Sequence, residues 1–167
     1  IHTLGSKTVS LLFKKNIIQN IADLYDLKIN QLIYLKGFGE KSKSVKKAEN
    51  IVNSIEVSKQ VPFEKVLYGL GIRHVGKTVS KKIANYFSSI QNLRNSSRND
   101  LLSIDEVGEK IANSILDYFQ NPDNMLLIER LSNHGVLFEI SKKIKKSNKL
   151  SDFTFVISGT FTTSREG

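Results

Sequence analysis

Four short glycine-bearing stretches recur along the chain, and each combines residue types that bind anions. Every copy reads as an apolar residue, two variable residues, a second apolar residue, glycine, one variable residue, and then Lys or Thr. The shared glycines are Gly5, Gly39, Gly76 and Gly108, at nearly even spacing. Four matches in register indicate an internal repeat rather than a chance coincidence.

The chemistry expected at each glycine is the binding of a phosphate oxygen. Glycine at the point where the chain reverses into a helix can adopt positive φ and lets a partner approach the backbone closely. The first N–H groups of that helix have no intrahelical acceptor, and with the helix dipole they form an anion site. Two residues after the glycine, Lys7, Lys41 and Lys110 add a positive charge, and in the third copy Thr78 takes this place, preceded by Lys77.

Apolar spacing predicts the elements that carry these glycines. A short apolar segment precedes three of the copies, and a longer segment with apolar residues three and four apart follows all four, which is typical of helices. We therefore expect a mainly α fold of four tandem helix-hairpin-helix motifs, arranged as two pseudo-two-fold pairs. A further helix is predicted from Asn121-Pro122-Asp123 to about Gly135, followed by a short extended segment over 136–140. The recurring aromatic pairs, Tyr86-Phe87 and Tyr118-Phe119, are interpreted as core residues rather than base-stacking platforms.

Composition favours a polyanionic partner and excludes several other classes of site. The formal charge is +9, from 25 basic and 16 acidic side chains. There are no cysteines, so neither a disulfide nor a thiolate metal site is possible within the chain, and His2, His74 and His134 lie far apart. No apolar run is long enough to cross a membrane. We expect a monomeric cytoplasmic protein with no metal site, no cofactor and no catalytic residue of its own in this chain.

The predicted partner is duplex DNA, bound through its backbone, because phosphate contacts set position but carry no base information. Two hairpins related by a pseudo-two-fold axis suit the two strands of a duplex across the minor groove. The fourth copy is the weakest on charge, because acidic residues surround its glycine. The predicted DNA-binding residues are Gly5, Lys7, Gly37, Gly39, Lys41, Arg73, Gly76, Lys77, Thr78, Gly108 and Lys110.

The run from Leu70 to Gly76, Leu-Gly-Ile-Arg-His-Val-Gly, resembles a signature of the bacterial NAD-dependent DNA ligases. Residues 22–27, 35–42, 105–108 and 133–136 are similar to the same family, in the same order. The resemblance implies a parent enzyme that seals nicks in duplex DNA during replication and repair. In that family a lysine takes AMP from NAD and passes it to the 5′ phosphate, and the 3′ hydroxyl then displaces the AMP with assistance from Mg²⁺.

The resemblance also implies what this chain does not contain. The Lys-x-Asp-Gly adenylation motif and the four cysteines of the family's zinc finger are absent. NAD, Mg and Zn are therefore expected in the parent enzyme and not in this chain, which we expect to be an inactive fragment.

One domain, a linker and the beginning of a second domain are predicted along the chain. Residues 1–140 form the helix-hairpin-helix DNA-binding domain, and residues 141–149 a lysine-rich linker. Residues 150–167 alternate and are β-branched, and they resemble the first strand of the BRCT domain that closes these ligases. Only the beginning of that domain is present, so a folded BRCT domain is not expected.

Two other hypotheses remain open. The same repeats could belong to the DNA-binding region of a repair nuclease or recombination subunit. Alternatively, the chain could be a helical protein-interaction module that does not contact DNA. An enzyme in its own right is the least expected, because the aspartates are isolated and are better explained as helix caps or solvated residues.

Overall fold

The structure is a computed structural model that describes residues 1, 3–35 and 41–140, with the side chains of 41–43 left aside. Within this part of the chain the backbone forms α-helices, one 3-10 helix and an isolated antiparallel bridge between Ser89 and Glu139. The prediction of a mainly α fold is confirmed. The predicted linker at 141–149 and the predicted BRCT strand at 150–167 lie outside the described residues.

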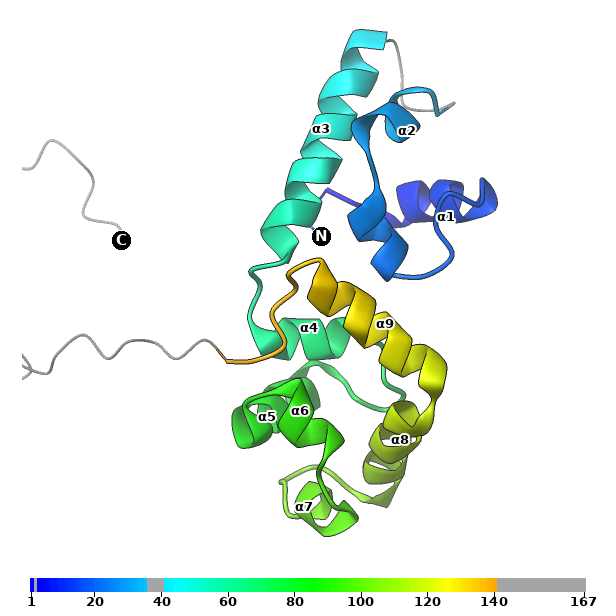
Figure 1. Cartoon of the computed structure of the whole chain (residues 1–167). Helices are drawn as coiled ribbons and strands as arrows, with labels where there is room; N and C mark the ends of the chain where they lie inside the picture. The colour runs from blue at the N-terminus through cyan, green and yellow to red at the C-terminus, as the bar shows by residue number, and fades with distance from the viewer. Residues whose placement is uncertain (2, 36–40, 141–167) are drawn as a thin grey trace, which may run out of the picture.

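The N-terminal half packs around the long helix α3, which stands at the top of Figure 1 with α1 and α2 beside it. Its elements are α1 (Ser6–Lys14), the 3-10 helix η1 (Ala22–Asp26), α2 (Ile29–Ile33) and α3 (Lys41–Ser58). Its core is a cluster of buried aliphatic side chains that includes Leu12, Ile18, Leu32, Ala48, Ile51 and Ile55. Ala48, Ile51 and Ile55 recur three and four residues apart along α3, so one face of that helix covers the other elements.

The C-terminal half contains two short-helix, long-helix pairs and a closing helix. Its elements are α4 (Phe63–Gly69), α5 (Lys77–Phe87), α6 (Ile90–Arg94), α7 (Arg98–Leu102), α8 (Glu109–Gln120) and α9 (Pro122–Asn133). The fully buried side chains at its centre are Phe63, Leu67, Ile83, Leu93, Leu101 and Ile115. The order short helix, hairpin, longer helix holds for α4 and α5 around Gly76, and for α7 and α8 around Gly108.

The predicted closing helix and extended exit are confirmed. Asn121 accepts a hydrogen bond from the backbone N–H of Asp123 at the start of α9, and Pro122 occupies the first turn, where its missing N–H costs nothing. After the helix, Gly135 takes a φ of +84°. The exit then pairs with the start of α6, because Ile90 donates its N–H to the carbonyl of Phe138 over 2.8 Å.

One interpretation of the aromatic residues is wrong. Phe87 is buried as expected, but Tyr86 is 55% exposed. The reason is helical geometry, since adjacent residues on a helix point about 100° apart and only one of the two faces the core. Tyr118 and Phe119 are both half-buried against the C-terminal core.

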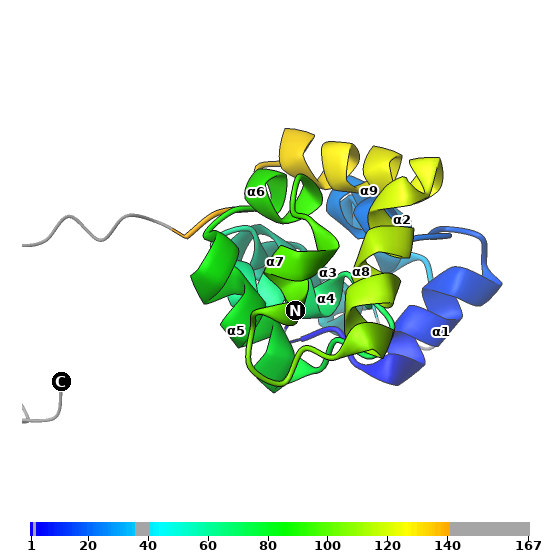
Figure 2. The same cartoon turned by 90° about the horizontal axis from the view of Figure 1, so that it is seen from below.

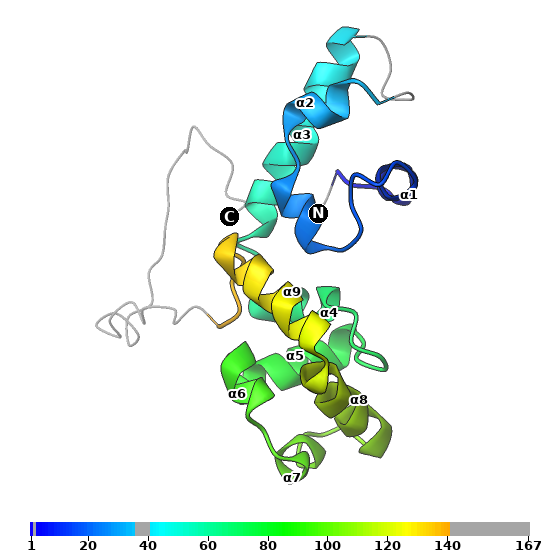
Figure 3. The same cartoon turned by 45° about the vertical axis from the view of Figure 1, so that its right-hand side comes forward.

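A polar contact joins the two halves where α9 lies against the 3-10 helix η1. Figure 3 shows the course of α9 below the N-terminal half. The Arg130 guanidinium donates to Asp23 over 2.9 Å and to Asp26 over 3.0 Å. His134 lies 3.2 Å from the Asp26 carboxylate and stacks on Tyr25, with ring centroids 5.9 Å apart. None of the helices that the structure describes is both long and apolar enough to cross a bilayer.

Candidate nucleic-acid interface

The two apolar positions of the repeat form a tight turn in every copy that the structure describes. The second apolar residue donates its N–H to the carbonyl of the first: Leu4 to Ile1 over 3.3 Å, Val75 to Ile72 over 3.0 Å, and Val107 to Ile104 over 3.0 Å. In the third and fourth copies both residues are buried in the C-terminal core. The third and fourth hairpins are thus anchored to the core by their apolar residues, and the glycine that follows is exposed.

Each described glycine is the N-cap of the helix that follows it, in extended backbone. The φ and ψ values are −78° and 162° at Gly5, −80° and 177° at Gly76, and −92° and 179° at Gly108. The expectation that these glycines are needed for positive φ is wrong. In the third and fourth copies the chain reverses two residues earlier, where His74 has a φ of 65° and Glu106 a φ of 67°.

Glycine at these positions is also not required by contacts within the chain. A Cβ atom added at Gly5, Gly76 or Gly108 would meet no heavy atom of the described chain within 4 Å. The space in front of each glycine is open, and the backbone there is accessible. The remaining reason for glycine at these positions is that it lets a partner approach the helix N-terminus closely.

The helices that begin at the glycines differ from their neighbours in how their first N–H groups are satisfied. Ser89, Ser97 and Asn121 accept hydrogen bonds from the first turns of α6, α7 and α9. No side chain caps α1, α5 or α8. Helices α2 and α4 also lack a side-chain cap. In α2 the Gln31 side chain instead accepts from the Lys28 N–H, and α4 begins at Phe63, which is buried in the core. The first N–H groups of α1, α5 and α8 are therefore available to an external acceptor.

Positive side chains surround these uncapped helix ends. Lys7, Arg73, Lys77, Thr78 and Lys110 are all exposed, and the first turns of α1 and α5 carry no acidic residue. A cation in the first turn opposes the helix dipole, so these lysines do not stabilise their own helices. They raise the positive potential at the point where the free N–H groups lie, which is an arrangement that suits an anion.

The fourth hairpin carries acidic residues that are paired within the chain. The Lys82 ammonium group lies 2.5 Å from Asp105 and 3.0 Å from Glu106, and Arg98 pairs with Glu109. The hydrogen bond from Lys82 lowers the pKa of the Asp105 carboxyl, and the same bond raises the pKa of Lys82. Sequence reasoning missed Lys82 and Arg98, since no local pattern links them to partners that lie so far along the chain.

The structure brings three of the four predicted hairpins into comparable form. Gly37 and Gly39 lie outside the described residues, and so does the side chain of Lys41. In the view from below, α1, α5 and α8 begin along one edge of the molecule, the lower edge in Figure 2. The uncapped helix ends therefore face a common side.

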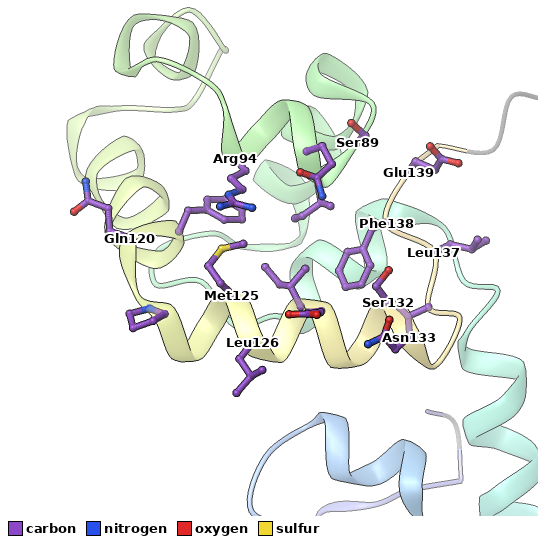
Figure 4. Close-up of a pocket in the computed structure, with 17 residues that line it drawn as sticks. Ser89, Arg94, Gln120, Met125, Leu126, Ser132, Asn133, Leu137, Phe138 and Glu139 are labelled. Atoms are coloured by element: carbon purple, nitrogen blue, oxygen red, sulfur yellow. The ribbon is translucent and has the colours of Figure 1, made fainter.

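A separate groove of about 950 Å³ lies along α9, away from the hairpins. Figure 4 shows Met125 and Phe138 pointing into it. Arg94, Glu129 and Glu139 are the charged residues in its lining, so its composition does not match an anion site. Among the described residues no group of three His, Cys, Asp or Glu side chains is placed to hold a metal ion.

The comparisons with known proteins agree with this geometry. Residues 65–128 match the helix-hairpin-helix motif, and this stretch contains the third and fourth hairpins. The chain is 44% identical to a DNA ligase of Flavobacterium johnsoniae over 163 residues, which is 96% of this chain and 24% of that ligase. It is 48% identical to a DNA ligase of Phocaeicola vulgatus over 160 residues, 95% of this chain and 23% of that ligase.

The chain is homologous to one segment of the bacterial DNA ligases. The predicted relationship to a bacterial DNA ligase is thereby confirmed, and the helix-hairpin-helix motif with it. A DNA ligase of Cytophaga hutchinsonii gives the same result, with 47% identity over 161 residues. The chain spans about a quarter of the length of the ligases that it matches.

Proposed function

We propose that this chain binds the backbone of duplex DNA, irrespective of base sequence, as part of an NAD-dependent DNA ligase that seals nicks in the cytoplasm. The observation that carries the proposal is the set of three exposed, uncapped helix N-termini at Gly5, Gly76 and Gly108. They occur in a chain homologous to ligases, whose substrate is implied by their name. A polyphosphate partner satisfies free N–H groups and neighbouring lysines together.

The binding mode follows from the geometry of each hairpin. A phosphate oxygen accepts hydrogen bonds from the first N–H groups of the helix, and the lysine in that turn supplies the countercharge. The second copy, with Gly37, Gly39 and Lys41, completes a set of four tandem hairpins in this proposal. Two hairpin pairs then hold both strands of a nicked duplex, with one copy of the chain per site.

The chemistry of ligation belongs to other parts of the parent enzyme in this proposal. NAD, Mg and Zn act there, while residues 1–140 hold the duplex, residues 141–149 link, and residues 150–167 begin a BRCT domain. The purified chain is expected to leave nicked duplex unsealed in the presence of NAD and Mg²⁺. Sealing by the purified chain would overturn this division of labour.

The direct test replaces Lys7, Lys77 and Lys110 together by Ala and measures binding to random-sequence duplex by fluorescence anisotropy over a range of salt concentrations. Each phosphate contact that is lost lowers the slope of log affinity against log salt by about 0.9. The matched control is the triple change of Lys14, Lys15 and Lys65 to Ala, which removes the same charge from exposed residues away from the glycines.

The expected result is a shallower slope for the hairpin variant than for the control. Equal slopes would show that the net charge and not the hairpins governs binding. If neither the chain nor its variants bind duplex, the proposal fails and a protein-interaction module becomes the better interpretation.

A further inference from the structure

We propose that Lys82 is a positioning residue that acts through the acidic turn of the fourth hairpin: it compensates the charge of Asp105 and Glu106 so that this hairpin can lie beside the DNA backbone. The inference rests on the proposed function, and deepens it by assigning different tasks to the third and fourth hairpins.

The two hairpins of the C-terminal half differ in sign at equivalent positions. Arg73 and His74 occupy the third and second places before Gly76, while Asp105 and Glu106 occupy the same places before Gly108. The backbone follows the same course in both, since His74 and Glu106 share positive φ angles of 65° and 67°. The fourth hairpin thus has the same backbone conformation as the third, but the two acidic residues in its turn would repel a phosphate.

Helix α5 supplies the missing charge from one face. Lys82 lies within 3.0 Å of Glu106 and closer to Asp105. One helical turn further along the same face, the Tyr86 hydroxyl lies 3.2 Å from Ser103 Oγ. The helix that begins at the third hairpin therefore contacts the approach to the fourth at two points.

The ion pair is poorly placed to stabilise the fold. The Asp105 side chain is 87% exposed and that of Glu106 is 53% exposed. Exposed pairs of this kind contribute little to folding, because water screens them and ordering long side chains costs entropy. Compensation matters more when a phosphate backbone comes near, since like charges brought together in an interface oppose binding.

The experiment is a double-mutant cycle in the 167-residue chain, with binding to random-sequence duplex as the readout. Lys82→Ala is measured in the native background and again with Asp105→Asn and Glu106→Gln. In the native background we expect Lys82→Ala to weaken binding about fivefold, and in the neutral background by less than about twofold. The neutral turn alone is expected to bind as tightly as the native chain or more tightly.

Two further variants separate this role from others. Lys82→Arg keeps the charge and is expected to retain native affinity. Lys81→Ala removes a neighbouring exposed lysine and is expected to lose the same affinity in both backgrounds. Far-ultraviolet circular dichroism and thermal unfolding verify that each variant is folded.

The outcomes are distinct. An equal loss on Lys82→Ala in both backgrounds overturns the inference, because Lys82 would then contact the phosphate itself. No loss in the native background overturns it as well, and both results leave the proposed DNA binding intact. Failure of the native chain to bind duplex rejects the proposed function instead.

Discussion

At the scale of single residues, the hairpin glycines are required neither by their backbone angles nor by contacts within the described chain, which leaves binding as the reason for them. Their positions were predictable from the repeat, because glycine followed by a helical pattern marks a helix start. Their backbone angles were not, since the reversal falls on His74 and Glu106: positive φ is uncommon for any residue other than glycine, and only histidine of these two is enriched there. The open space in front of Gly76 is the observation that points to a binding partner.

Replacing Gly76 by Ala is expected to weaken DNA binding without harming the fold. The added methyl group occupies the space in which a phosphate would sit, and loss of a charge-assisted hydrogen bond corresponds to about tenfold in affinity. Ala suits the negative φ at Gly76 and restricts the unfolded chain, whereas Gly is the better N-cap residue, so the free energy of unfolding should change by less than about 1 kcal/mol. Anisotropy and urea denaturation measure the two quantities.

Gly69→Ala is the matched control for that change. Gly69 lies in the last turn of α4, and an added Cβ there also meets no heavy atom within 4 Å. Its affinity for duplex should remain native. Native affinity in Gly76→Ala would show that no partner approaches this backbone closely.

Most substitutions in the core lower the free energy of unfolding, but we expect Ser80→Ala not to lower it. Its side chain is fully buried in α5, and its Oγ has no hydrogen-bond partner among the described residues. Ser80→Ala removes an unsatisfied hydroxyl, so the free energy of unfolding should stay level or rise by up to about 1 kcal/mol.

Ser58→Ala gives the contrast for Ser80→Ala. Ser58 is buried too, but its Oγ donates to the carbonyl of Ile55 over 2.6 Å and contacts the Tyr25 hydroxyl at 3.2 Å. Its loss should destabilise the chain by about 1 kcal/mol. Equal effects of the two changes in denaturation curves would contradict this account of Ser80.

At the scale of elements, the helices of the repeat were predictable, the short α4 and α7 included, and two short helices outside the repeat were missed. The apolar period locates α5, α8 and α9, and Asn121 with Pro122 fixes where α9 begins. The five-residue helix α6 and the 3-10 helix η1 are too short for a period to be visible. Their start signals, Ser89 and Asn20, were present in the sequence but are common in loops as well.

The cap of α7 provides a test at this scale. Ser97 accepts a hydrogen bond from the backbone N–H of Asp100, and the Asp100 carboxylate accepts one in return from the N–H of Ser97. Ser97→Ala should lower the free energy of unfolding by about 1 kcal/mol, whereas Ser97→Thr, which can cap in the same way, should lower it less. Equal thermal midpoints for both variants would argue that the cap is not formed.

At the scale of the whole molecule, the contact between η1 and α9 joins the N-terminal and C-terminal halves of the described chain. Arg130 reaches Asp23 across 107 residues of sequence, so no local pattern could have indicated the pair. The sequence alone favours helix-capping or solvent-exposed positions for Asp23 and Asp26. The capping interpretation is right for Asp23, because its other carboxylate oxygen accepts hydrogen bonds from the N–H groups of Gln19 and Asn20.

This contact predicts a pH dependence of stability. Burial by itself would raise the pKa of Asp23, but hydrogen bonds from the Gln19 and Asn20 backbone and from Arg130 outweigh it and lower the pKa below 3.8. A carboxyl with a lowered pKa stabilises the fold above its ordinary pKa, and the contribution is lost as pH falls through the lowered value. The native chain should therefore lose stability below about pH 4.

Asp23→Asn should reduce that loss, because the titrating group is gone. Urea denaturation at pH 6 and at pH 3 gives the two free energies for each protein. Asp117→Asn, which removes an exposed carboxylate on α8, serves as the control and should keep the native difference. The same difference for all three proteins would exclude Asp23 as the source of the pH dependence.

The two hydrophobic clusters have a consequence for how the chain acquires its structure during synthesis. The buried members of the N-terminal cluster fall between Leu12 and Ile55, and those of the second, apart from Ala22, between Phe63 and Phe138. Each core closes over a continuous stretch of chain, so contacts are local in sequence, a property that accompanies rapid folding. The N-terminal half has all of the buried residues of its own cluster once Ile55 has left the ribosome, and its packing can begin before the C-terminal half is translated.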